Sequence, residues 1–202
     1  MKIAFVPLVL SIVGLATFAS AQDFYVGGGL AYSSGTSDHV TGGSGSSELS
    51  AGMVTLILGQ RFAAGSGFWG WETSADLSFG HETENPATGA GCAVAATGSY
   101  LCKHDATLRL VGIYGMPVGQ GTEIYGSLGL GMLMGDYADN TWSVESASTR
   151  GVTVGVGLNR DFGNGLTGRG EVIYDNFNND TQEQLDSVYK GATVRLALLH
   201  KF

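Results

Sequence analysis

The chain has 202 residues, enough for one domain, and it is acidic, with 18 Asp and Glu residues against 10 Lys and Arg residues. Its formal net charge of −8 argues against nucleic acid as a partner, because nucleic acid attracts basic surfaces. The 33 Gly residues favour a fold in which strands curve tightly and backbones approach closely.

The first 21 residues have the pattern of a cleavable secretory signal peptide. Lys2 supplies a positive start, an apolar stretch follows, and an A-x-A cleavage site directly precedes Gln22. The alternative is a membrane anchor, but the apolar run is short for a spanning helix and Pro7 interrupts it. We therefore expect residues 1–21 to be removed after export and residues 22–202 to form the mature domain.

Eight segments downstream alternate apolar and polar side chains with the two-residue period of a β-strand. The segments span residues 24–32, 48–62, 68–80, 105–116, 122–134, 150–162, 166–176 and 187–202. The third has the cleanest alternation, with Trp69 and Leu77 on one face and Ser74 on the other. Each segment can supply most or all of the ~9–11 residues with which a tilted strand crosses a bilayer.

The connections between these segments alternate in length. Short turns that contain Gly occupy residues 63–67, 117–121 and 163–165. Longer polar connections occupy residues 33–47, 81–104, 135–149 and 177–186. Short turns on one side and long loops on the other are typical of outer-membrane barrels, in which the turns face the periplasm.

Aromatic residues fall at two levels of the predicted strands. The ends beside the short turns and the termini carry Phe24, Phe62, Trp69, Phe162 and Phe202, and the ends beside the long loops carry Tyr32, Phe79 and Tyr174. Two aromatic levels separated by aliphatic residues are typical of the interfacial girdles of a membrane barrel. A soluble β-sandwich or a lipocalin-like barrel is the alternative. We predict an all-β fold, an eight-stranded antiparallel transmembrane up-and-down β-barrel.

The chain resembles the small eight-stranded outer-membrane barrels, such as the OmpA transmembrane domain, OmpX and the opacity proteins. The resemblance rests on the first strand FYVGGGLAY, on the segment GLTGRGEVIYDNF and on the last strand VRLALLHKF. It implies the outer membrane of a Gram-negative bacterium, with membrane lipid, lipopolysaccharide and the barrel-assembly machinery as partners. Phe202 would be the assembly signal, although His200 stands where the family commonly has an aromatic or aliphatic residue.

Strand parity directs five charged side chains into the lumen near mid-depth. They are Glu72, Asp76, Arg109, Glu171 and Arg195. An eight-stranded barrel is only wide enough for side chains to fill, and unpaired buried charges are costly. We therefore predict a plug of ion pairs, in which Glu72 and Asp76 pair with Arg109, and Glu171 pairs with Arg195. A gate whose pairs rearrange to pass small ions is the alternative, which the family resemblance allows.

Cys92 and Cys102 lie in one polar segment. In an exported protein a disulfide is favoured, because two thiols without a nearby His pair fall short of a zinc site.

Acidic residues dominate the predicted outer loops and their flanks. They are Asp38, Glu48, Glu82, Glu84, Asp136, Asp139, Glu145, Asp180, Glu183 and Asp186. Solvation of the loops explains them; binding of Ca²⁺ or Mg²⁺ beside lipopolysaccharide is the weaker hypothesis, because no spaced ligand loop exists. We expect no cofactor.

Catalysis has little support in the sequence. His39, His81 and His104 fall in or near outer loops and His200 at the periplasmic rim, without a neighbouring nucleophile pattern. We therefore expect a monomeric, non-enzymatic barrel with a structural or surface-interaction role. A narrow ion channel and, third, a lipid-modifying enzyme remain the alternatives, and the sequence does not identify a ligand for the loops.

Overall fold

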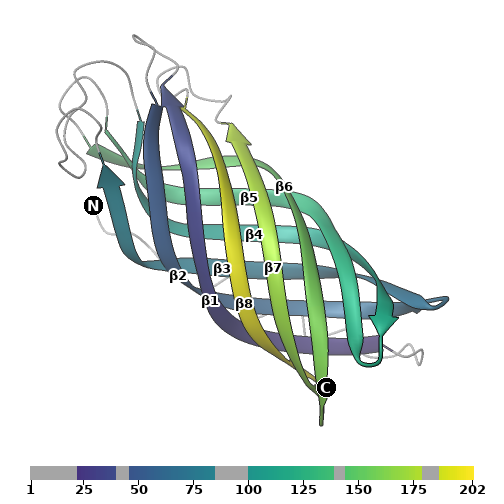
Figure 1. Ribbon diagram of the computed structural model, residues 1–202. Helices are drawn as coiled ribbons and strands as arrows, with labels where there is room; N and C mark the ends of the chain where they lie inside the picture. The colour runs from purple at the N-terminus through teal and green to yellow at the C-terminus, as the bar shows by residue number, and fades with distance from the viewer. Residues whose placement is uncertain (1–21, 40–45, 85–99, 139–143, 179–186) are drawn as a thin grey trace, which may run out of the picture.

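The computed structural model describes residues 22–39, 46–84, 100–138, 144–178 and 187–202, which form one closed antiparallel barrel (Figure 1). The strands are β1 (Gln22–His39), β2 (Ser46–Ala64), β3 (Gly67–Glu84), β4 (Tyr100–Gly119), β5 (Thr122–Ala138), β6 (Val144–Gly163), β7 (Leu166–Asn178) and β8 (Ser187–Lys201). No helix among the described residues is long and apolar enough to span a membrane. The predicted signal peptide lies outside the described residues.

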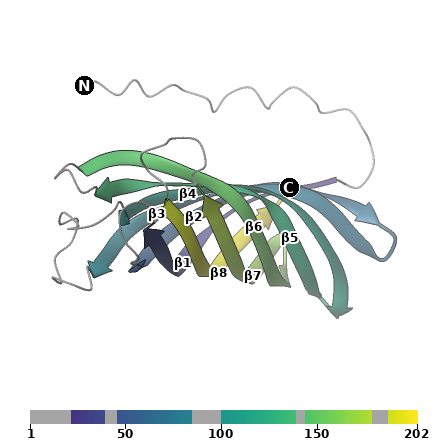
Figure 2. The same ribbon diagram turned by 90° about the horizontal axis from the view of Figure 1, so that it is seen from above.

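The pairing register fixes the tilt of the strands. The row of paired residues that starts at Tyr25 runs through Gly59, Glu72, Val111, Gly129, Thr153, Asp175 and Gly191. It returns to β1 at Gly35, ten residues (35 − 25) further along the strand. With standard strand spacings, this offset over eight strands corresponds to a tilt of about 40°. Both views show the strands running obliquely around the wall (Figures 1 and 2).

The eight predicted strands are confirmed, but several are longer than predicted on the side of the long connections. β1 continues to His39 and β2 begins at Ser46, so much of the loop expected over 33–47 is paired strand. Thr36, for example, pairs with Glu48. Apolar side chains alternate with polar ones only along the part of a strand that would face lipid. Hydrogen bonding between the strands continues beyond that part, into polar sequence.

The two faces of the barrel are chemically inverted relative to a soluble protein. Large apolar side chains on the outside are exposed, including Leu30, Leu56, Leu110, Leu128, Leu130 and Leu196 at 56–67 %. Charged side chains inside are buried, including Arg195 at 1 % and Asp76 at 0 %. Outside, Phe62 and Trp69 stack with their ring centroids 4.5 Å apart near the turns. This distribution suits hydrocarbon around the barrel.

One predicted face assignment, on β4, is wrong. Alternation counted back from the inward Arg109 and Thr107 places Ala106 outside and Asp105 inside. Ala106 does pair with the outward Leu77 and Met134, but Asp105 is exposed. A register shift between His104 and Ala106, in the pairing of β4 with β5, causes the reversal. The same irregularity turns His104, which was expected in or near an outer loop, into the lumen at 1 % exposure.

Large rings inside the barrel lie against glycines of the neighbouring strand. The pairs are Tyr25 with Gly59, Phe68 with Gly115, and Tyr125 with Gly157. At each of these glycines an added Cβ would lie 2.4 Å from a ring atom. These inward-facing glycines therefore make room for aromatic side chains in a narrow barrel.

The described turns and the chain end lie at the same end of the barrel (Figure 1). Gly65 and Gly121 adopt positive φ angles of 61° and 64° in the β2–β3 and β4–β5 turns. The backbone N–H of Phe202 donates to the carbonyl of Phe24 at 2.9 Å, which ties the last residue to β1 beside these turns.

Candidate functional site

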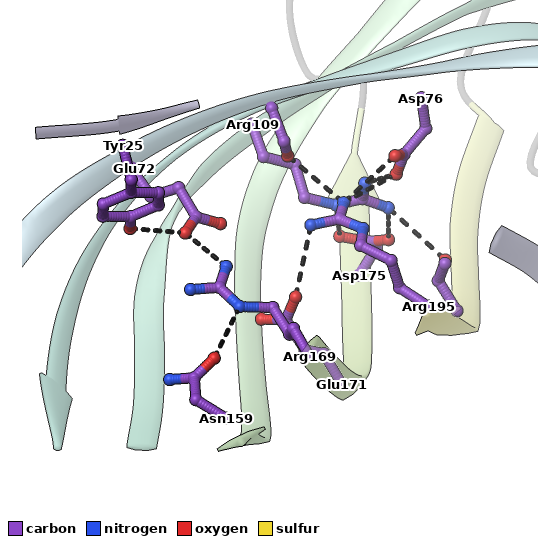
Figure 3. Close-up of polar contacts among 11 residues, drawn as sticks. Tyr25, Glu72, Asp76, Arg109, Asn159, Arg169, Glu171, Asp175 and Arg195 are labelled. Carbon is purple, nitrogen blue, oxygen red and sulfur yellow. Dashed lines mark hydrogen bonds and ion pairs between the residues drawn. The ribbon is translucent and has the colours of Figure 1, made fainter. Parts of the chain in front are cut away.

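The centre of the lumen holds seven charged side chains, which we call the lumen plug (Figure 3). They are Glu72 and Asp76 on β3, Arg109 on β4, Arg169, Glu171 and Asp175 on β7, and Arg195 on β8. Each is at most 5 % exposed. The two-residue period of each strand directs them inward, and the narrow lumen brings opposite walls within reach of a single arginine.

The first layer of the plug is centred on Asp76, which two arginines share. Arg109 contacts Asp76 through Nη1, and Arg195 donates from Nη2 to Asp76 Oδ2 at 2.8 Å. Arg109 Nε donates to Asp175 Oδ1 at 3.0 Å, and Arg195 Nη1 lies 3.2 Å from Glu171 Oε2. Since β3 and β7 stand on opposite sides of an eight-stranded barrel, this layer crosses the full lumen.

The second layer lies nearer the turns and is centred on Arg169. Arg169 pairs with Glu72 through Nη1, and its Nε donates to Asn159 Oδ1 at 3.0 Å. The hydroxyl of Tyr25 donates to Glu72 Oε2 at 2.7 Å. The guanidinium carbon of Arg169 lies 4.8 Å from the ring centroid of Tyr125. This layer crosses from β7 to β3 as well.

A third ion pair stands at the turn end of the lumen. Arg61 Nη1 lies 2.8 Å from Glu123 Oε2, and its guanidinium carbon lies 4.1 Å from the ring centroid of Phe68. A hollow of about 220 Å³, which Asp23 and Lys201 also line, opens beside this pair. The buried arginine therefore separates this vestibule from the plug.

The opposite end of the lumen is closed by apolar packing. The side chains of Leu49, Leu133, Phe177 and Tyr189 form one cluster, and none is more than 2 % exposed. The hydroxyl of Tyr189 shares a 3.0 Å hydrogen bond with Ser33 Oγ. Apolar packing on one side and ion pairs on the other thus enclose the plug.

The five lumen residues predicted from the sequence all face inward, but one pairing is wrong. Asp76 contacts Arg109, and Arg195 contacts Glu171, as expected. Glu72 pairs with Arg169 rather than Arg109. Glu72 lies four residues before Asp76, or about 13 Å along the strand, which is too far for one guanidinium to serve both carboxylates.

Sequence reasoning missed Arg169 and Asp175 as members of the cluster, although both lie an even number of residues from Glu171 on the same predicted strand and therefore share its inward face. The predicted set had two arginines for three carboxylates, and this imbalance was the signal that a third arginine was needed. Tyr25, Asn159, Arg61 and Glu123 carried no comparable signal, since their roles depend on which strands face each other across the lumen.

The remaining predicted sites are only partly visible. Cys92 lies outside the described residues, as does the side chain of Cys102, so the disulfide stays a prediction. Asp136 accepts a hydrogen bond from Ser146 at 2.8 Å and lies 3.6 Å from Lys103 Nζ. Glu48 is exposed on β2, and the side chains of the other eight predicted loop acids are not among those described. No described group of three or more His, Cys, Asp and Glu side chains could hold a metal ion.

The described histidines lie in unlike surroundings. His104 Nε2 lies 2.7 Å from Thr107 Oγ1, but both residues are only 1 % exposed, so a substrate has no route to this pair. His200 is exposed at the turn end, with its ring centroid 5.0 Å from that of Phe202. The side chains of His39 and His81 are outside the described set.

A closed barrel with an apolar outside, aromatic side chains at both ends of its apolar band and an ion-paired lumen defines the class of integral outer-membrane β-barrels. More particularly, the chain belongs to the outer membrane protein beta-barrel domain family, whose model matches residues 5–202. The protein is thus an outer-membrane β-barrel of bacterial type. A search of curated protein sequences finds no match.

Solved outer-membrane proteins share the fold at low sequence identity. OprG from Pseudomonas aeruginosa is 16 % identical, with a TM-score of 0.56, over 90 % of this chain and 96 % of its own. Neisserial surface protein A is 11 % identical, with a TM-score of 0.53, over 91 % of this chain and 100 % of its own. Ail, the attachment invasion locus protein of Yersinia pestis, is 13 % identical, with a TM-score of 0.50, over 89 % of this chain and 99 % of its own. These identities establish a common fold and no more.

Proposed function

We propose that this protein is a monomeric, non-enzymatic barrel that displays its long connections outside the cell and has a structural or surface-interaction role. Residues 1–21 would direct export and be cleaved, and Phe202 would be read by the barrel-assembly machinery. The observation that carries the proposal is the plug, because two layers of buried ion pairs cross the lumen and leave the wall as a rigid support. Function would then reside on the outer surface.

The energetics of the plug argue against free passage of ions. Removing one partner of a buried ion pair costs about 3–5 kcal/mol, because the other charge is left without compensation. An ion moving through the lumen would have to separate contacts of Arg109, Arg195 and Arg169 in turn. The plug would therefore keep the barrel closed at rest.

The composition of the long connections limits what they can bind. They are predominantly acidic, which suits basic or neutral partners, or anionic surfaces reached through bridging divalent ions. The Ail structure contains a heparin analogue, sucrose octasulfate, which is a polyanion. The acidic connections of this chain would repel such a ligand.

A narrow ion channel is the second candidate, and one observation favours it. Asp76 is shared by two arginines, each of which has a second carboxylate partner. Within the described residues, Arg169 Nη2 and Arg195 Nε have no hydrogen-bond partner. Exchange of partners within the plug could therefore open a path without leaving any arginine wholly unpaired.

Current measurements in planar bilayers separate the two candidates. We expect the purified protein to give no large, stable conductance, and Asp76→Ala to raise the frequency of small openings. Stable wild-type pores comparable to those of general porins would refute the plugged barrel. Protease cleavage of the long connections on intact cells tests the surface role independently, and protection of those connections would contradict it.

A further inference from the structure

Two hollows lie end to end on the lipid-facing side of β4, β5 and β6, and we call them together the outer furrow. The hollow nearer the turns has a volume of about 740 Å³, and Tyr114, Leu128 and Val154 line it. The other has a volume of about 500 Å³, and Leu130 and Val152 line it. Leu128 and Leu130 are successive outward residues of β5, as are Val154 and Val152 of β6, so the two hollows are neighbours on the same strands.

Two outward glycines explain why the wall is hollow at the end of the furrow nearer the turns. Gly112 on β4 and Gly126 on β5 are exposed at positions whose neighbours on the same face carry large side chains. A Cβ added at Gly112 or Gly126 would meet no atom closer than 3.8 Å or 3.9 Å, respectively. The 740 Å³ hollow therefore lacks side-chain volume, and the floor of the furrow is apolar.

A positive charge stands at the end of the furrow nearest the long connections. Arg150 on β6 lines the 500 Å³ hollow and is exposed on the outside of the barrel. Among the described residues it has neither an ion-pair nor a hydrogen-bond partner. Other outward cations differ: Lys103 lies 2.9 Å from Asp105, and Arg160 donates to the carbonyl of Gln120 at 2.6 Å.

The depth of Arg150 matches the outer surface of the membrane. Tyr174, in the outer aromatic level, pairs with Val154, and Arg150 lies four residues further toward the long connections, about 13 Å along β6. Arg150 pairs with Met132 on β5, and Gly126 lies six residues below Met132. Six residues of a strand tilted by about 40° span roughly 15 Å of depth, which is one leaflet of a hydrocarbon core about 30 Å thick.

We propose that the outer furrow binds the phosphorylated lipid anchor of lipopolysaccharide, with an acyl chain in the furrow and a phosphate on Arg150. The apolar floor suits a hydrocarbon chain, and its length matches one leaflet. The guanidinium of Arg150, which has no partner among the described residues, is complementary to a phosphate at the level where lipid headgroups lie. The proposal rests on the orientation given under Proposed function, with the long connections outside the cell.

The test measures lipid binding to the full-length protein in detergent by native mass spectrometry, with diphosphorylated lipid A as the probe. We expect saturable binding of lipid A that weakens about fivefold in Arg150→Gln, the effect of one cation at a lipid surface. Gly126→Leu should also weaken binding, because the side chain fills the furrow. Both variants should keep the heat-modifiable gel mobility of a folded barrel.

Two matched controls isolate the site. Arg160→Gln removes an outward arginine from the same strand at the turn end, and Gly170→Leu fills an outward glycine on β7, outside the furrow. Both should bind lipid A like the wild type. The proposal is wrong if Arg150→Gln binds as tightly as the wild type, or if Arg160→Gln loses as much affinity. Cross-linking through the furrow between two copies of the chain would also overturn it, since a second barrel would then occupy the surface.

The lipid result and the proposed function can fail separately. Protease cleavage on intact cells reports the orientation, and bilayer currents report the plug, and neither depends on Arg150. Correct orientation and a closed lumen with unchanged lipid A binding in Arg150→Gln would reject the furrow site alone.

Discussion

Replacement of Arg169 by methionine tests whether the lumen is held together by paired charge. Methionine keeps much of the packing volume between Tyr25 and Tyr125 but removes the guanidinium that pairs with Glu72. Glu72 is only 2 % exposed, and its other hydrogen-bond partner among the described residues is the hydroxyl of Tyr25. The substitution therefore leaves a buried carboxylate with one neutral donor.

The expected loss is large because removing one partner of a buried pair costs about 3–5 kcal/mol. Glu72→Gln should cost a similar amount, because it leaves the buried Arg169 without a carboxylate. The double variant Glu72→Gln/Arg169→Met should be much less unstable than the sum of the single variants, since replacing a whole buried pair with neutral groups is often close to neutral.

Urea unfolding of the barrel in lipid vesicles, followed by tryptophan fluorescence, measures these differences. Arg160→Met, which changes an exposed arginine on the outside, is the control and should shift the free energy of unfolding by no more than about 0.5 kcal/mol. The reasoning is refuted if Arg169→Met lies within about 1 kcal/mol of the wild type, or if the two single-variant losses simply add.

Three further substitutions follow from single features of the structure. Gly59→Ala should destabilise the barrel by about 1–3 kcal/mol, because the added Cβ would lie 2.4 Å from the Tyr25 ring. Urea unfolding should show a smaller loss from Gly59→Ala when Tyr25 is also replaced by leucine. Equal losses with Tyr25 and with leucine at this position would contradict the contact. Cys92→Ser should make Cys102 reactive toward a maleimide, whereas the unreduced wild type should not react; labelling of the wild type would count against the predicted disulfide. Deletion of Phe202 should lower the fraction of heat-modifiable barrel in isolated outer membranes. The residue ties the end of β8 to β1 through a hydrogen bond to Phe24, and it is the predicted assembly signal. An unchanged fraction would show that neither role limits assembly.

The sequence was sufficient for the architecture, because a strand between lipid and a polar lumen must alternate its side chains. Leu128 and Leu130 lie outside and Ser127 lies inside for this reason, and that alternation required no knowledge of the fold beyond the strand. The outward position of Asp105 could not be predicted in the same way. An extra residue in one strand shifts the parity, and no Gly or Pro marks the position in the sequence.

Partner identity inside the lumen was harder to predict than orientation. Glu72 and Arg169 meet because closure with eight strands places β3 opposite β7, and the ten-residue advance of the register brings the two residues to the same level. That advance is a property of the closed barrel and cannot be read from the sequence of any one strand. Parity alone therefore showed that Glu72 points inward but assigned it to the arginine of the adjacent strand.

Accessibility of the lumen to a water-soluble thiol reagent tests the plug most directly. With both native cysteines replaced by serine, Ser74→Cys places a thiol beside Arg195, where Ser74 is 6 % exposed, and Ser66→Cys places one on an exposed turn as the control. We predict that the folded barrel reacts at position 66 and stays unreacted at position 74 until it is unfolded. Rapid labelling at position 74 in the folded barrel would mean that water and reagent pass freely where the ion pairs should close the lumen.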